Sequence, residues 1–209
     1  GPPQRQMNDR TTNTSRKTIL ERLRSRRIGD PPLPEIDAQR LTRFDDPLAK
    51  FVEMLQFVGG QSHLVESEGE IRAILGELQP FSTAEQIVSL LPEVHAGNVD
   101  PSVIDDPHAY GSVDWVIATG EFPVAENGAI WVPGHSLPDR VLLFIPQYLA
   151  IVVSRGRIVH NMHEAYARIG RPPKGFGVFV SGPSKTADIE QSLVLGAHGC
   201  RALQVFLMP

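Results

Sequence analysis

The amino-acid sequence predicts an α/β fold: a three-layer α/β/α sandwich with a mostly parallel central sheet and a helical N-terminal arm. Short apolar runs typical of buried strands alternate along the chain with segments whose apolar residues recur at helical spacing. In the last such unit, two apolar runs at residues 177–180 and 203–207 flank a segment with helical spacing. Because a helix between two strands implies a right-handed crossover, we expect these runs to pair as parallel strands.

The distribution of charge divides the chain into an arm and a body. Residues 1–43 hold ten Lys or Arg against five Asp or Glu, whereas residues 44–209 hold ten against nineteen. The arm is expected to contain one helix at about residues 15–27, followed by a stiff linker with three prolines. We therefore expect a basic, partly disordered arm over residues 1–43, whose helix docks on an acidic surface, and an α/β domain over residues 44–209.

The expected domain begins with two helices whose starts are marked by capping residues. Asp46 followed by Pro47 predicts an N-cap with proline in the first turn of a helix. Ser67 and Glu70 form a capping box that opens the second helix. Strands are expected over residues 62–65 and 86–91.

The centre of the chain is expected to be a run of strands that follows a long loop at residues 92–111. His95 and His108 in this loop are interpreted as surface residues. The pair Asn127-Gly128 favours a tight hairpin between two of the strands. The expected strands cover residues 114–119, 121–125, 129–132, 141–146 and 149–153.

Two histidines, His160 and His163, lie three residues apart on a helix expected over residues 158–169. This spacing would let them share a metal ion, but their order differs from the zinc-protease motifs and no third ligand lies nearby in the sequence. We therefore expect no metal ion and interpret them as polar residues of an amphipathic helix.

Composition excludes several classes of protein. No apolar stretch approaches the roughly 18 residues of a membrane span, and no hydrophobic signal segment is found, so we expect a cytoplasmic protein that binds no membrane. The basic arm lacks interleaved aromatic residues, which argues against nucleic acid. A single cysteine, Cys200, excludes an internal disulfide and a thiolate cage for an iron–sulfur cluster. We expect no cofactor in this chain, and any cluster must belong to a partner.

The segment 181–186, Ser-Gly-Pro-Ser-Lys-Thr, is the strongest candidate for a binding loop. Gly182 permits close approach of the backbone, Ser184 or Thr186 can cap the following helix, and Lys185 adds a positive charge. Such a loop suits a small anionic ligand. The alternative is that these residues only cap the helix, while Asp188 favours its positive end. The segment is not a Walker A loop, because the glycine before the lysine is missing.

The chain also resembles a known family. The string SGPSKTADIEQSLVLGAHG, at residues 181–199, resembles the C-terminal signature of the LUD domain, and residues 122–132 resemble that family's strand–turn–strand. The similarity spans about residues 113–209. It implies the architecture shared by sugar-phosphate isomerases and CoA transferases (NagB/RpiA/CoA transferase-like). It also implies a role in lactate utilisation, the oxidation of L-lactate to pyruvate, together with iron–sulfur partner proteins, while self-association stays open.

The resemblance assigns roles to individual residues. Glu126 matches the family's own glutamate and is expected to act as a general base, although it is equally an ordinary residue at the entry to a hairpin. The sequence departs from the family at Asn127, Lys185, Cys200 and Tyr148, where threonine, arginine, proline and histidine are usual. The expected catalytic residues are Glu126, Lys185 and Asp188, and the expected ligand-binding residues are Asn127, Gly128, Ser181, Gly182, Ser184, Thr186 and His198.

Two roles remain open at this point. The chain is either a subunit without a cofactor that supports partners carrying clusters, or a stand-alone enzyme, transferase-, isomerase- or ligase-like, acting on an anionic or phosphorylated substrate. The cysteine count does not choose between them. The acid–base residues and the anion loop favour a small-molecule site, whereas the charge of the arm favours a partner.

Overall fold

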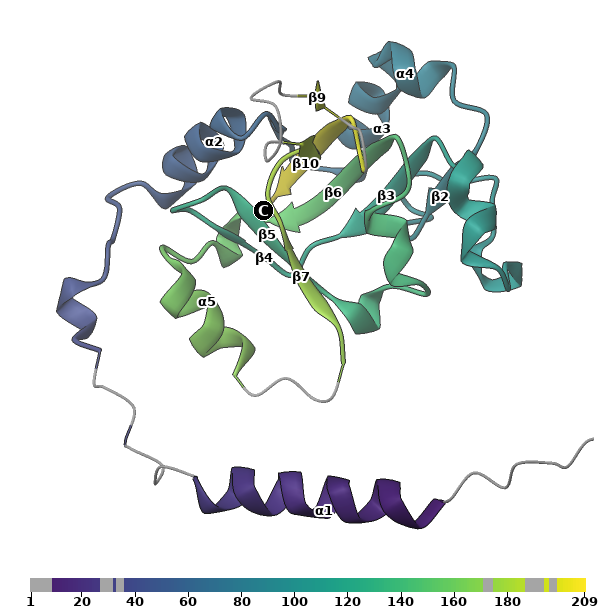
Figure 1. Ribbon diagram of the computed structural model, residues 1–209. Coiled ribbons are helices and arrows are strands. Elements are labelled where there is room, and N and C mark those ends of the chain that lie inside the picture. The colour runs from purple at the N-terminus through teal and green to yellow at the C-terminus, as the bar shows by residue number, and fades with distance from the viewer. Residues whose placement is uncertain (1–8, 27–31, 33–35, 171–174, 187–193, 196–198) are drawn as a thin grey trace, which may run out of the picture. The chain divides into compact units, whose positions relative to one another are not determined.

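The computed structural model describes residues 9–26, 32, 36–170, 175–186, 194–195 and 199–209, in two units that span residues 1–40 and 41–209 (Figure 1). In the first unit, helix α1 (Asp9–Ser25) covers most of the expected helix and begins earlier. The apolar side chains of its stripe are exposed, with Ile19 at 58% and Leu23 at 63%. A short 3₁₀ helix, Ala38–Arg40, ends this unit.

The core of the second unit is a five-stranded sheet in which every neighbouring pair is parallel (Figure 1). Five consecutive residues are buried in each of β6 and β10, as expected for strands covered by other elements on both faces. The parallel central sheet expected from the sequence is therefore confirmed. In spatial order the strands are β1 (Gln61–Leu64), β10 (Ala202–Met208), β6 (Tyr148–Ser154), β3 (Trp115–Thr119) and β2 (Ile87–Ser89).

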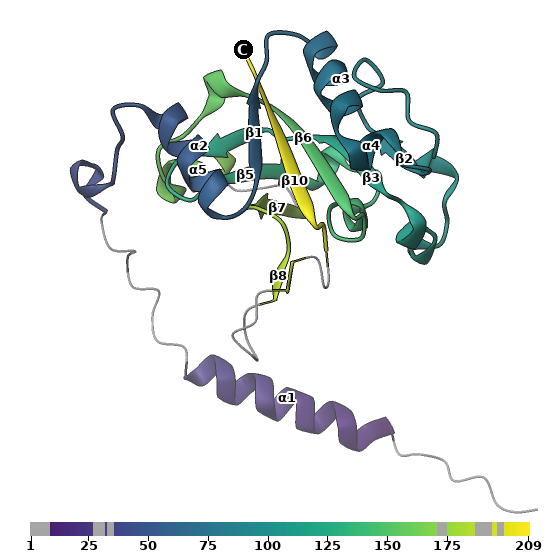
Figure 2. The same ribbon diagram turned by 90° about the horizontal axis from the view of Figure 1, so that it is seen from above.

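Helices α3 (Glu68–Glu77) and α4 (Gln79–Ser82) cover one face of this sheet (Figure 2). The hydroxyl of Ser67 accepts the N–H of Glu70 at 3.3 Å, as the capping box predicts. On the sheet, Trp115 stacks on Tyr148 with ring centroids 4.9 Å apart. Its indole N–H donates to the carbonyl of Pro80 at 3.0 Å, which fixes α4 to the sheet.

The other face is covered by helix α2 (Pro47–Phe57) and by a second, three-stranded antiparallel sheet. Asp46 caps α2 by accepting the N–H of Ala49 at 2.9 Å. Helix α5 (Met162–Ile169) packs on the outer side of the small sheet. This layer is therefore a helix and a sheet rather than helices alone, and the expected hairpin around Asn127-Gly128 is confirmed. The strands of the small sheet are β4 (Phe122–Val124), β5 (Ala129–Pro133) and β7 (Gly177–Val180).

The expected parallel pairing of residues 177–180 with 203–207 is wrong, because the first run is β7 of the small sheet and the second is β10 of the large one. Strand β7 pairs antiparallel with β5, where Gly177 lies flat against Trp131. Val194 and Leu195, expected in a helix, form β9, which pairs with β8 (Lys185–Thr186). The remainder of that expected helix, at residues 187–193, lies outside the described residues.

The strand expected at residues 141–146 is also wrong. A 3₁₀ helix, Arg140–Leu143, starts there because the carboxylate of Asp139 accepts the N–H of Val141 at 3.0 Å. This turn buries two consecutive leucines, Leu142 and Leu143. The loop at residues 92–111 contains two further 3₁₀ helices, Pro101–Val103 and Pro107–Ser112. In the described part of the chain, no helix is both long and apolar enough to cross a membrane.

Candidate functional site

The hairpin turn that the sequence singles out is held tightly against helix α2. The Oδ1 atom of Asn127 accepts the N–H of Ala129 at 3.1 Å, which closes the turn. Gly128 has a φ of 66°, and a Cβ atom there would lie 2.6 Å from the backbone nitrogen of Leu55. Only glycine satisfies both the left-handed conformation and the close approach to α2.

Glu126 directs its carboxylate at the first turn of helix α5. Its Oε1 atom accepts the N–H of Met162 at 3.0 Å, and its own N–H donates to the carbonyl of His160 at 3.1 Å. Asn161 is the N-cap of α5, and its side-chain oxygen accepts the N–H of Glu164 at 3.0 Å. Glu126 therefore supplies a helix cap, and the general-base role expected for it stays a prediction.

The structure brings the hairpin turn and the loop at residues 181–184 together. The hydroxyl of Ser181 donates to the carbonyl of Asn127 at 2.9 Å. Gly182 has a φ of 75° and packs on the end of α2, where a Cβ atom would lie 2.4 Å from the carbonyl oxygen of Val58. The N–H of Ser184 donates to the carbonyl of Cys200 at 2.9 Å. These described groups of the loop thus bond within the protein and build a scaffold.

The remaining expected residues are only partly described. The backbones of Lys185 and Thr186 form strand β8, paired with β9. Asp188 and His198 lie outside the described residues. So does the first turn of the expected helix, at residues 187–190, whose N–H groups were expected to bind the anion. The anion-binding role of residues 181–186 therefore stays a prediction.

The structure shows the surroundings of Tyr148 and Cys200, two positions that depart from the family pattern. Tyr148 is half-buried on β6 and stacks on Trp115 in the core. Cys200 is buried, and loss of hydration raises the pKa of its thiol above the usual value.

Of the two histidines weighed as metal ligands, His160 accepts the N–H of Phe44 at 3.1 Å through Nδ1. In the described ranges, no group of three or more His, Cys, Asp or Glu is placed to hold a metal ion.

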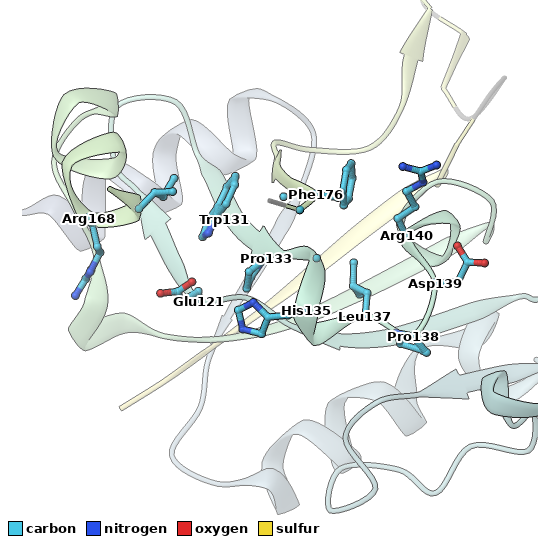
Figure 3. Close-up of a pocket in the computed structure, with 14 residues that line it drawn as sticks. Glu121, Trp131, Pro133, His135, Leu137, Pro138, Asp139, Arg140, Arg168 and Phe176 are labelled. Carbon is cyan, nitrogen blue, oxygen red and sulfur yellow. The ribbon is translucent and has the colours of Figure 1, made fainter. Parts of the chain in front are cut away.

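A cavity of about 850 Å³ lies at the opposite end of the small sheet (Figure 3). Strands β5 and β7 run antiparallel, so Ala129 and Ser181 lie near the hairpin turn, whereas Pro133 and Gly177 lie at the cavity. The cavity lining comes from the ends of β5 and α5, the start of β7 and the segment after β5. Its residues are Glu121, Trp131, Pro133, Gly134, His135, Leu137, Pro138, Asp139, Arg140, Arg168, Ile169, Gly175, Phe176 and Gly177.

The polar groups of this cavity fall into two sets. Figure 3 shows Glu121, Trp131 and His135 grouped toward one end and Arg140 beside Phe176 toward the other. The guanidinium of Arg140 lies 5.9 Å from the Phe176 ring centroid. Within the described residues, the side chains of Glu121, His135 and Arg140 make no hydrogen bond or ion pair.

Sequence reasoning missed this cavity because its residues are spread over residues 121–177. The local signals for this cavity were two glycines, Gly177 and Gly134, at positions in its wall where a side chain would not fit. A Cβ atom on Gly177 would lie 2.2 Å from the Trp131 ring, and one on Gly134 would lie 2.3 Å from the carbonyl oxygen of Phe176. Glu121 gave a further signal, since it follows the carboxyl end of β3, where ligands of parallel sheets bind.

Comparisons with known proteins show similarity over the second half of the chain. Residues 107–208 match the model of the LUD domain family. A protein named lactate utilization protein C from Bacillus pumilus is 33% identical over 89 residues, which cover 40% of this chain and 37% of that protein. The protein of the same name from Geobacillus thermodenitrificans is 35% identical over 89 residues, with the same coverage of 40% and 37%. The chain thus spans less than half the length of these relatives.

A solved structure supports the fold. The crystal structure of a DUF162 family protein from Deinococcus radiodurans aligns with a TM-score of 0.55 over 78% of this chain and 96% of that one. The sequences are 18% identical, so this likeness concerns the fold alone.

Proposed function

Because this chain is a LUD-domain protein, we propose that it takes part in lactate utilisation, the oxidation of L-lactate to pyruvate, alongside iron–sulfur partner proteins. The observation that carries the proposal is the match over residues 107–208 together with relatives named for lactate utilisation. The partners supply the electron transfer, because the single cysteine of this chain provides no thiolate cage for a cluster.

Affinity purification of the tagged chain from lactate-grown native cells tests this role. Two cysteine-rich proteins are expected to co-purify, and deletion of the gene is expected to stop growth on L-lactate alone while growth on glucose continues. The untruncated chain restored from a plasmid is the control. Normal growth of the deletion strain on L-lactate would contradict the proposal.

The second part of the proposal places the carboxylate of a small ligand at residues 181–186. The contact of Ser181 with the hairpin turn supports it, because the two stretches that resemble the LUD family meet there. Lys185 supplies the positive charge, and a hydrogen bond to a charged group contributes about 1.5–3 kcal/mol. The turn and loop hold the backbone against α2, so the ligand meets a preorganised surface.

Calorimetry with L-lactate and pyruvate tests this site. Lys185→Ala is expected to weaken binding by roughly 10- to 100-fold, since about 1.4 kcal/mol is a factor of ten. Lys17→Ala, which removes an exposed lysine from helix α1, is the matched control and should leave binding unchanged. Absence of heat with the wild-type chain at millimolar ligand would show that the loop is only a scaffold.

A stand-alone enzyme acting on an anionic substrate is the second candidate function. The cavity favours it, because a carboxylate and an imidazole, Glu121 and His135, line a concave space beyond the carboxyl end of β3 and have no side-chain partner among the described residues. Turnover by the purified chain without partners would favour this candidate over the subunit role.

A further inference from the structure

The cavity at the end of the small sheet is larger than lactate utilisation by itself requires. Its volume of about 850 Å³ lies in the upper part of the range of pockets that enclose drug-sized ligands, about 300–1,000 Å³. A three-carbon acid has six heavy atoms and would leave most of this space to water. The size points to a ligand of cofactor dimensions.

Two aromatic side chains give the cavity flat apolar surfaces. Trp131 is half-buried, leans on Phe179 with ring centroids 4.8 Å apart, and has its ring edge against Gly177. Phe176 is 37% exposed and lies on the neighbouring wall. A ring system held in this way has little freedom left to lose, so it suits stacking of a planar ligand.

Four charged side chains line the cavity, and two of them are engaged within the protein: Arg168 donates to the carbonyl of Arg157, and Asp139 accepts the N–H of Val141. The other two, Arg140 and Glu121, lie toward different ends of the cavity (Figure 3). Arg140 presents a guanidinium that has no carboxylate partner in the described part of the chain, because the neighbouring Asp139 is engaged as a cap. A guanidinium matches phosphate or carboxylate oxygens bidentately. Glu121, toward the other end, offers a carboxylate that accepts N–H or O–H donors (Figure 3).

We propose that this cavity binds a nucleotide, with the base stacked on Trp131, its N–H groups donated to Glu121, and the phosphate held by Arg140. Few metabolite classes combine a planar heterocycle with donors at one end and a phosphate at the other within this volume. This site is separate from the ligand site proposed at residues 181–186, because β7 lies between them and its four residues span roughly 13 Å.

Tryptophan fluorescence of the untruncated chain, titrated with ADP, tests the proposal. The chain has two tryptophans, of which Trp115 is buried in the core, so a change caused by ligand in the cavity reports on Trp131. ADP is expected to quench the signal, adenosine to quench it with weaker affinity, and pyrophosphate to leave it unchanged. The ADP response is expected to disappear in Trp131→Phe, while calorimetry still detects ADP binding.

Arg140→Ala should weaken ADP binding by about 10- to 100-fold and leave adenosine binding unchanged, because only ADP carries the phosphate. Arg40→Ala, an exposed arginine that lines no part of the cavity, is the matched control. Both replaced side chains are exposed, so both variants should unfold at the wild-type temperature.

Three results would overturn the inference: no ADP binding at millimolar concentration, equal effects of Arg140→Ala and Arg40→Ala, or a quench that persists in Trp131→Phe. L-lactate at millimolar concentration should not displace ADP, since the two sites lie at opposite ends of β7. Displacement would mean a single site, whereas failure of lactate to bind would count against the loop proposal alone.

Discussion

One of the two carboxylate oxygens of Glu126 is engaged by the backbone. Its Oε1 atom takes the N–H of Met162 at 3.0 Å, one of the N–H groups at a helix start that have no partner within the helix. A general base must offer a lone pair to the proton of its substrate, and the Oε2 atom of Glu126 makes no hydrogen bond among the described residues, so one carboxylate can cap α5 through Oε1 and still accept a proton. Substitutions can separate the two roles, because glutamine keeps a capping oxygen but cannot act as a base.

Glu126→Ala removes the acceptor and is expected to lower the free energy of unfolding by about 1 kcal/mol, the typical contribution of a helix cap. Glu126→Gln keeps a side-chain oxygen in place and is expected to lower it by no more than about 0.3 kcal/mol. Urea unfolding of the two variants and the wild type measures the difference. Equal losses would mean that the negative charge near the start of α5, rather than the hydrogen bond, is what stabilises the helix.

At the level of elements, the sequence predicts best where the signal is local. The start of α2 is set by Asp46 and that of α3 by Ser67, because each cap bonds a backbone N–H three residues away. The Asn127-Gly128 turn is equally local. The pairing predicted for β7 was wrong, because an apolar run of four residues does not show which sheet it joins. That choice depends on the distant Trp131, against which Gly177 packs. The cavity was missed for the same reason.

The boundary between arm and body shows which contacts begin the folded domain. The carbonyl of Thr42 accepts the side-chain amide of the buried Asn161 at 2.9 Å. Arg43 forms an ion pair with Glu164 at 2.9 Å, and the N–H of Phe44 donates to His160 at 3.1 Å. Residues 42–44 thus tie the chain to the start of α5.

Removal of residues 1–40 is therefore expected to leave the midpoint of thermal unfolding within about 2 °C, because the described side chains of α1 bury little apolar surface. Removal of residues 1–45 takes away the three contacts to α5, which together contribute roughly 2 kcal/mol. It should lower the midpoint by about 4–8 °C, because each 1 kcal/mol shifts the midpoint by about 2–4 °C in a domain of this size. Differential scanning calorimetry compares the two. A large loss already in the shorter truncation would place the arm within the core.

On the scale of the whole molecule, the chain joins a basic arm to an acidic body. The arm carries a surplus of five positive charges and residues 44–209 a deficit of nine. Opposite charges of this size favour association that weakens as salt screens it, since the Debye length falls from about 10 Å at 0.1 M to about 3 Å at 1 M. Any complex held through the arm should therefore dissociate in high salt.

The amino-acid composition also predicts which chains of such a complex bind iron. Cys200 is the only cysteine and its thiol is buried, with a pKa raised by loss of hydration, so it stays protonated at neutral pH and is a poor metal ligand. The purified chain is expected to be colourless and free of iron after anaerobic reconstitution with iron and sulfide. Absorption spectra and iron analysis check this, with the same treatment of the co-purified partners as the positive control. Stoichiometric iron together with visible absorption in the isolated chain would show that other residues ligate a cluster and would remove the reason for assigning electron transfer to partners.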